Sequence, residues 1–343
     1  MHAQGSTDTL TASAADAVST IFDDLYRPDS VVSLKMELDL ERFLENKDID
    51  AYYPAILHFR DVADQKVSWP IEIKARGRSR RQFCDFPPLK LRFFSDDLAT
   101  KQLANFNQFK MVTHCRKSVD IRKIVLKEYL VYRIWQLLSE NSFRVQLFEV
   151  TYRDIRQADR TFQAYAFLLE DEAHVAARLQ GEVVQQRGAL SKYIDQEELT
   201  FLALFQYFIG NTDWLVDRQH NIKFVKCPAA LKLKILPYDF DACGLVGAAY
   251  AIPASHLPIE AVQERLFLGD CVSPEAFEQG LTIFREKKTA IFDLIRQFEP
   301  LDQRSRKIMI RYLEQFYRAI DKANFIDKVL LKECLGTEKQ TGR

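Results

Sequence analysis

The stretch "IGNTDWLVDRQHNIKFV" at residues 209–225 is followed by "ILPYDFDACG" at residues 235–244. Within and between these segments, "NIKFV" and "LKLKIL" each alternate apolar with polar residues, and "KCPAA" between them can reverse the chain. This pattern predicts two antiparallel strands joined as a hairpin. The start of the first strand then lies beside the end of the second, so residues distant in the sequence meet at the open end of the hairpin.

Four oxygen-bearing side chains belong to this open end. Asn221 begins the first strand, Asp239 and Asp241 follow the second, and Asp213 lies on the loop that enters the same end. Crowded carboxylates need a cation, a proton or wide separation, and magnesium takes oxygen ligands and often arrives with phosphates. We therefore predict that Asp213 orients an acceptor hydroxyl and that the other three residues bind metal. The alternative is that each residue caps a turn, where Asp and Asn are common.

A basic segment, "KARGRSRRQFCDFPPLKLR", lies upstream at residues 74–92. Its glycine falls at a predicted turn, where backbone N–H and guanidinium groups can contact phosphate oxygens. We expect Arg76, Arg78 and Arg80 to bind nucleotide phosphates, and Lys90 to face a cleft as the phosphate lysine. The alternative is a solvated basic hairpin. A nucleic-acid patch is not expected, because no aromatic stacking platform interleaves these charges.

Two glutamates are further candidates. A lysine that contacts phosphate is commonly held by a Glu from a neighbouring helix. Glu128 has this place on the helix expected at residues 119–140, although it can equally pair with a basic neighbour along that helix. Glu170, in "FLLEDE", is predicted to line a pocket for the nucleotide base.

The order of elements predicts the fold class. Strand-like alternation dominates residues 31–113, and it returns at residues 144–154 and 161–171. After residue 172 we expect mainly helices, at 196–210, 258–269, 273–298 and 301–335. This order predicts an α+β arrangement of two unequal lobes with a ligand cleft between them. The expected parts are a flexible leader at 1–28, a strand-rich N-lobe with one long helix at 29–170, a helical C-lobe at 171–335 and a tail at 336–343.

The overall composition of the chain excludes few classes of function. The chain has 343 residues with 48 Lys+Arg and 48 Asp+Glu, so net charge does not point to nucleic acid or acidic membranes. No apolar run reaches the ~18 residues of a transmembrane helix. The first twenty residues lack the basic start and apolar stretch of a signal peptide. We expect a periplasmic or secreted location if an export signal precedes this sequence, and a cytoplasmic location otherwise.

None of the six cysteines forms a CxxC pair, so a structural zinc site is not expected. One interpretation is that all of them are reduced core thiols. The other is a disulfide between Cys84 and Cys115 on neighbouring strands, which would indicate an oxidising compartment.

In this order the segments resemble CotH-type atypical kinases, a branch of the protein-kinase-like superfamily. The matching motifs span roughly residues 70–250 and are "RGRSRR" with "PLKLRFF", then "VLKEYLVYRIWQLL", "AYAFLLED", "NTD" with "HN", and "PYDFDACG". The chain is also similar to bacterial proteins of unassigned role that carry "CDFPPL", "IGNTDW" and "PYDFD". "NTD" with "HN" resembles HipA-like kinases, and "DFD" resembles aminoglycoside phosphotransferases.

The resemblance implies a two-lobed protein-kinase-like fold. It also implies an ATP-dependent phosphotransferase that uses Mg²⁺ or Mn²⁺ and acts on a protein or small hydroxyl acceptor. Asp213 corresponds to the catalytic-loop Asp, Asn221 to the metal-binding Asn, and Asp239 to the principal metal Asp, with Asp241 a candidate second ligand.

The chain departs from that family in ways that favour an alternative. Asp213 and Asn221 are eight residues apart, which is longer than in ordinary protein kinases, and Asp217 competes for the role of base. No GxGxxG loop is present, and Lys74 and Lys110 compete with Lys90 as the phosphate lysine. The alternative is a catalytically inactive, pseudokinase-like binding or structural module.

A hydrolase is the least favoured interpretation. The chain has no HExxH or GxSxG motif, and its histidines are scattered. We therefore interpret His114 and His220 as structural or loop residues.

Overall fold

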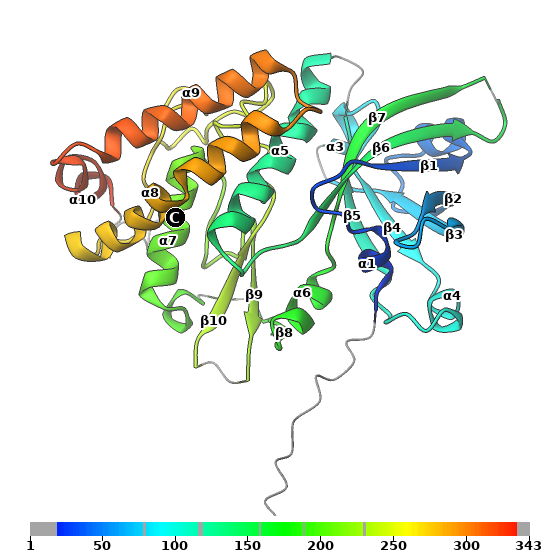
Figure 1. The fold of residues 1–343 in the computed structure, drawn as a ribbon, viewed down its shortest axis with the longest axis horizontal. Coiled ribbons are helices and arrows are strands. Elements are labelled where there is room, and N and C mark those ends of the chain that lie inside the picture. The colour runs from blue at the N-terminus through cyan, green and yellow to red at the C-terminus, as the bar shows by residue number, and fades with distance from the viewer. Residues whose placement is uncertain are drawn as a thin grey trace, which may run out of the picture.

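The structure is a computed structural model with an α+β fold, in which a β-barrel packs against a group of helices (Figure 1). The residues described are 19–77, 80–115, 119–157, 159–186, 188, 190–228 and 231–334.

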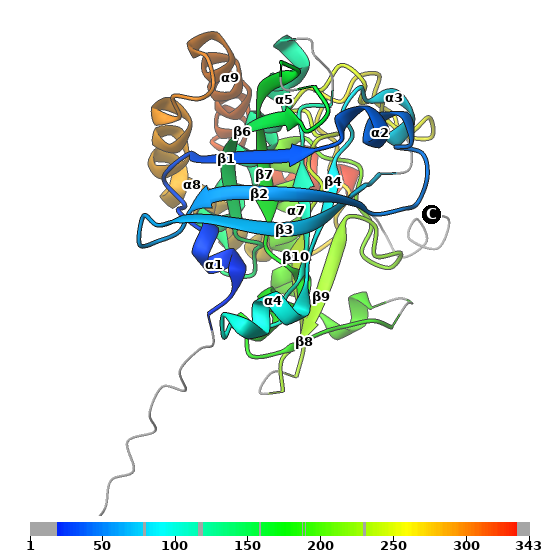
Figure 2. The same ribbon diagram turned by 90° about the vertical axis from the view of Figure 1, so that its right-hand side faces the viewer.

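Seven strands form a closed barrel in the order β1-β2-β3-β4-β5-β7-β6. Neighbouring strands pair antiparallel, except that β6 closes on β1 in parallel. Figure 2 shows β1, β2 and β3 crossing one face of the barrel side by side. The strands are β1 (Val32–Leu38), β2 (Tyr53–Arg60), β3 (Lys66–Ala75), β4 (Leu89–Phe93), β5 (Gln108–Val112), β6 (Val145–Asp154) and β7 (Thr161–Leu169).

The barrel shows that the prediction of a two-lobed, protein-kinase-like fold was wrong. Alternation located the strands, but it did not reveal that β6 returns to pair with β1, for example Val32 with Phe148. This pairing closes the sheet and removes its two edges. The strand-rich half is therefore a closed barrel, and the α+β class is the part of the prediction that stands.

Apolar side chains fill the barrel. The burial pattern alternates along β1 and β4, as expected for strands with one face toward a core. The largest fully buried side chains inside include Phe93, Phe109, Phe148 and Tyr152. Three short helices add apolar side chains to the same core: α1 (Ile21–Leu25), α2 (Leu40–Glu45) and α4 (Ser95–Thr100).

The long helix α5 (Val119–Leu138) lies between the barrel and the antiparallel pair α8 (Pro274–Gln297) and α9 (Gln303–Ile320) (Figure 1). A second apolar core joins these helices to the outer faces of β6 and β7. The smaller helical elements are α3 (Arg80–Phe83), α6 (Glu172–Arg178), η1 (Ser191–Tyr193), α7 (Gln196–Ile209), η2 (Ile326–Leu330) and α10 (Leu331–Glu333).

Two of the expected helices differ from the structure. Residues 258–269 form turns and coil, in which Val262 and Phe267 are buried as loop residues. Their apolar spacing reflects this burial rather than a helical face. The helix expected at 301–335 ends at Ile320, and the chain resumes as η2 and α10 after a turn.

The predicted hairpin is confirmed. Strands β9 (Ile222–Lys226) and β10 (Leu233–Pro237) pair antiparallel, with Ile222 opposite Pro237. The short strand β8 (Glu182–Val183) pairs with the other edge of β9.

Two disulfides are present. Cys84–Cys115 is the bridge that the sequence left open, and Cys271–Cys334 was not anticipated because 63 residues separate its cysteines. Cys227 and Cys243 are free thiols. Across the part of the chain that the structure describes, no helix is both long and apolar enough to cross a membrane.

Candidate functional site

Three carboxylates converge at the open end of the hairpin, and we call them the acidic cluster. Glu128 on α5 and the two aspartates after β10, Asp239 and Asp241, each offer one oxygen, and these oxygens lie within 4.8 Å of one another. Glu128 is 1% exposed and Asp241 is 6% exposed. Burial raises the pKa of the Glu128 carboxyl well above its usual range, and the nearby charge of Asp241 adds to this effect.

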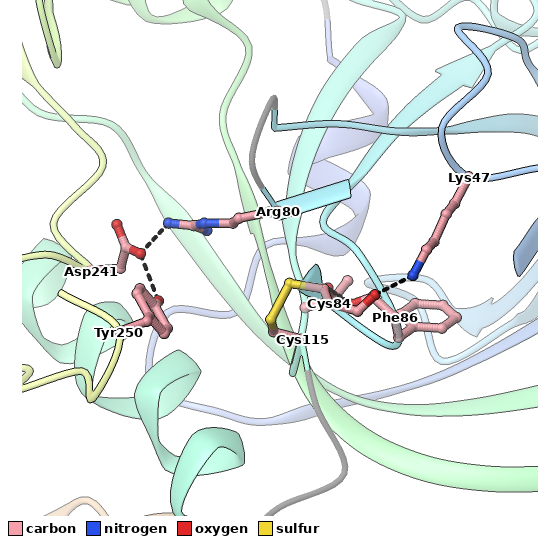
Figure 3. The surroundings of a disulfide bond; sticks show 8 residues. Lys47, Arg80, Cys84, Phe86, Cys115, Asp241 and Tyr250 are labelled. Atoms are coloured by element: carbon pink, nitrogen blue, oxygen red, sulfur yellow. Dashed lines mark hydrogen bonds and ion pairs between the residues drawn. A yellow bond between two sulfur atoms is a disulfide. The ribbon is translucent and has the colours of Figure 1, made fainter. Parts of the chain in front are cut away.

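An arginine enters this cluster from the barrel. The Arg80 guanidinium forms ion pairs with Asp241 and, at 3.4 Å, with Oδ1 of Asp239. Tyr250 donates a hydrogen bond of 2.6 Å to Oδ2 of Asp241. Figure 3 shows the side chains of Arg80 and Tyr250 both reaching the same carboxylate oxygen of Asp241, Oδ2.

One carboxylate oxygen of the cluster lacks a hydrogen-bond partner. Oε1 of Glu128 is buried and has no hydrogen-bond partner among the described residues. A buried carboxylate without a partner costs free energy unless it binds a proton or a cation. A proton or a divalent cation shared with Asp239 and Asp241 would satisfy the Glu128 carboxyl.

The backbone at the cluster is strained. Asp239 has φ of +64° and Asn221 has φ of +55°, both in the left-handed region that residues other than glycine seldom adopt. The Asp239 N–H donates to the Tyr132 hydroxyl at 2.8 Å, and Tyr132 lies one turn after Glu128 on α5. Helix α5 therefore supplies one carboxylate of the acidic cluster and also contacts the loop that supplies the other two. Such strain is concentrated at functional sites in many proteins.

A second group of side chains lies at the same end of the hairpin. Asn221 Nδ2 donates to the Asp213 carbonyl at 2.8 Å and to its Oδ2 at 3.0 Å. Nε2 of His220 lies 2.7 Å from Oδ1 of Asp213. The charge of Asp213 also helps to raise the pKa of Asp241, after burial as the main cause, so the two groups are within electrostatic range. The hairpin thus brings together the four residues expected to meet there.

Asp213 rather than Asp217 has the geometry of an acceptor-orienting residue. The Asp213 side chain is 51% exposed, so a substrate can reach it while His220 and Asn221 hold it. Asp217 instead accepts a hydrogen bond of 3.1 Å from the backbone N–H of Ser191 at the start of η1.

A cavity of about 620 Å³ lies where β4 and β5 meet α6 and β8. Lys90 and Lys110, which lie opposite each other on paired strands, both line this cavity. Lys74 forms an ion pair of 2.9 Å with Asp50 and is not among the cavity residues.

Lys110 has the more enclosed position. It forms an ion pair with Glu172, and its Nζ lies 4.9 Å from the centroid of the Tyr238 ring. Lys223 reaches the same carboxylate at 3.1 Å. Burial lowers the pKa of Lys110, although Glu172 opposes this effect. Both lysines lie near the ring of Tyr238, which immediately precedes Asp239, and Lys110 also lines the cavity.

The remaining predicted site residues have different outcomes. Glu170 lines the cavity, but its carboxylate accepts hydrogen bonds from Arg144 at 2.9 Å and Arg178 at 3.1 Å, so the side chain is engaged in structure. Arg76 is partly buried, and its positive charge opposes the rise in the pKa of Glu128. Arg78 lies outside the described residues.

Sequence reasoning missed Glu172, Lys223, Tyr238 and Tyr250 and interpreted His220 as structural. Tyr238 and Lys223 were detectable in part, since they flank the predicted aspartate and asparagine on the hairpin. Tyr250 lies in a loop without periodicity, and no sequence signal links it to Asp241.

No protein-family model matches the chain, and a search of curated proteins returns no match.

Proposed function

We propose that this protein is a metal-dependent phosphotransferase that moves phosphate from ATP to a hydroxyl of a protein or small molecule. The observation that carries the proposal is the acidic cluster, in which one oxygen from each carboxylate lies within 4.8 Å of the others and Glu128 has a buried oxygen without a hydrogen-bond partner. A cavity lined by Lys90 and Lys110 supplies a place for the nucleotide, and Lys110 contacts Tyr238, the residue before Asp239.

The acidic cluster would hold Mg²⁺ or Mn²⁺. Asp239 and Asp241 supply carboxylate oxygens, and Asn221 supplies an amide oxygen from the facing strand end. Held there, such an ion would supply positive charge to offset the negative charge that develops on the phosphoryl group during transfer. Glu128 was expected to hold a lysine, but its place in the cluster makes it a third acidic ligand.

The cavity would hold the nucleotide. Its volume of about 620 Å³ lies within the ~300–1,000 Å³ of small-molecule sites. Lys110 and Lys223 replace Lys90 as the main phosphate contacts in this proposal, because both lie beside Tyr238 and next to the acidic cluster. Arg76 and Lys90 contribute further positive charge.

The acceptor hydroxyl would meet Asp213. A carboxylate that already accepts from His220 and Asn221 keeps a fixed orientation while remaining half exposed. It can then accept a hydrogen bond from the acceptor hydroxyl and align its oxygen with the phosphate.

One observation favours a second candidate, a binding module without turnover. Arg80 already supplies a cation to Asp239 and Asp241. If this ion pair is permanent, it takes the place of a metal, and the protein binds a ligand without transferring phosphate.

A nucleotide and metal experiment separates the two candidates. We expect ATP with Mn²⁺ to raise the melting temperature by a few °C, because a ligand at a hundred times its Kd adds ~2.7 kcal/mol of stability. Labelled phosphate should then reach the protein or an added acceptor.

Asp239→Asn should abolish the transfer. Asp64→Asn is the matched control, because Asp64 has the same left-handed backbone, with φ of +61°, in an exposed turn of the barrel. A thermal shift without transfer would support the binding module. Absence of both responses would overturn both candidates.

A further inference from the structure

We propose that the Cys84–Cys115 disulfide holds Arg80 in the acidic cluster, so that reduction of this disulfide releases Arg80 and strengthens divalent-metal binding. The inference concerns regulation of the proposed metal site and rests on that part of the proposed function. It does not depend on phosphate transfer.

Arg80 occupies the oxygens that a metal needs. Its guanidinium pairs with Oδ2 of Asp241 and with Oδ1 of Asp239. A divalent ion among carboxylate oxygens that lie within 4.8 Å of one another must approach this guanidinium closely. Because like charges repel at short range, metal and Arg80 compete for the cluster.

The element that carries Arg80 has little packing of its own. Helix α3 has four residues, of which none is fully buried; the Arg80 side chain is 17% exposed, and Gln82 is exposed. At its end Phe83 contacts Tyr250 with ring centroids 5.6 Å apart. Arg80 and Phe83 thus reach both Asp241 and the tyrosine that hydrogen-bonds to it, from a helix too short to be stable alone.

The disulfide anchors α3 immediately after its last residue. Cys84 is fully buried and is bonded to Cys115, which lies three residues after β5 and is 8% exposed, while Lys47 donates to the Cys84 carbonyl at 2.6 Å (Figure 3). Two residues further on, the Phe86 N–H donates to the Cys115 carbonyl at 2.9 Å. These two hydrogen bonds do not need the sulfur bond, and β4 and β5 stay paired without it. Reduction therefore removes one constraint, the covalent link between the residue that follows α3 and Cys115.

The chemical step is thiol–disulfide exchange with an external dithiol. The dithiol attacks the protein disulfide, forms a mixed disulfide and closes to its own cyclic disulfide. Two electrons and two protons pass from the dithiol to the protein, which gains two cysteine thiols. The Arg80 contact is therefore retained in an oxidising compartment and released in a thiol-reducing one.

The test is calorimetric titration with Mn²⁺ alone, without nucleotide. We expect Cys84→Ser/Cys115→Ser and Arg80→Gln each to bind Mn²⁺ at least tenfold more tightly than the oxidised protein. The triple variant should bind no more tightly than Arg80→Gln, because both changes remove the same competitor. Cys271→Ser/Cys334→Ser removes the other disulfide and should keep the original affinity.

Reduction of the unaltered protein provides a second measurement that needs no folded cysteine variant. The protein is first treated with dithiothreitol, the reagent is removed under argon, and the free thiols are counted. Titration with Mn²⁺ should then show the same tenfold gain in affinity. Reoxidation should reverse it.

The outcomes are distinguishable. Unchanged affinity after loss of the Cys84–Cys115 bond, with tighter binding by Arg80→Gln, would overturn the role of the disulfide. Unchanged affinity in Arg80→Gln would overturn the competition itself. If no form of the protein binds Mn²⁺, both the proposed metal site and the proposed function are overturned. If Mn²⁺ binds but no phosphate is transferred, only the proposed enzymatic activity is overturned.

Discussion

The barrel interior and the open end of the β9–β10 hairpin both bury side chains, but the side chains they bury are of opposite chemical character. Aromatic and aliphatic side chains fill the barrel. The hairpin end instead buries carboxylates against one arginine and holds Asn221 and Asp239 in left-handed backbone conformations. In the barrel half, Asp64 has such a conformation in an exposed turn. The difference teaches that stability is concentrated in one region, while the other retains costly features that suit a binding site.

The largest expected effect tests the barrel side of this comparison. Phe93 is fully buried, with the rings of Trp69 and Phe109 both 5.8 Å away between centroids. Phe93→Ala should lower the free energy of unfolding by ~3–5 kcal/mol, because it removes buried surface and leaves a cavity. Urea denaturation measures this loss.

The next residue in the sequence supplies the control. Phe94 is 41% exposed, so Phe94→Ala should change the free energy of unfolding by less than ~1 kcal/mol. Equal losses at the two positions would contradict the view that the barrel interior carries the stability.

A smaller effect tests the strained backbone. At both Asn221 and Asp64, the alanine variant should be less stable than the glycine variant by ~1 kcal/mol, because alanine is disfavoured at positive φ and glycine is not. Chemical denaturation of the four variants gives these differences.

Metal affinity then distinguishes the two positions. Both Asn221 variants should bind Mn²⁺ at least tenfold more weakly, since they lose the amide, and both Asp64 variants should bind it normally. If the Asp64 variants lose affinity as well, the strain at residue 221 has no special connection to the site.

The smallest effect concerns the contact between α6 and the barrel. His174 is 8% exposed and faces Glu170, Asp23, Arg144 and Arg178. Burial lowers its pKa below the usual 6.5, so the unfolded chain takes up this proton at higher pH than the folded protein. Stability from this source is therefore complete above about pH 6.5 and declines as the pH falls below it.

Comparison of urea midpoints at neutral and mildly acidic pH tests this expectation. The decline should be smaller in His174→Gln, which cannot take up the proton. An identical decline in both proteins would assign the acid sensitivity to other groups.

Local pattern predicted the hairpin and most strands, because alternation and turn residues act over a few positions. It did not predict the barrel, whose closure depends on pairing Val32 with Phe148. The site divides in the same way. Asp213 and Asn221 lie eight residues apart and met because the loop between them folds back through the Leu215–His220 backbone pair. Arg80, in contrast, was expected at phosphate and instead reaches Asp241 from the barrel. Such contacts depend on packing between distant segments, which no short window contains.

The parallel pairing of β1 with β6 also affects how the chain is made. β1 ends at Leu38 and β6 at Asp154, so 116 residues must leave the ribosome between the two. At the usual pace of translation that interval is roughly 6–20 s. Throughout it one side of β1 exposes unpaired backbone groups, and the nascent protein has a sheet edge open to other chains that the finished molecule does not have.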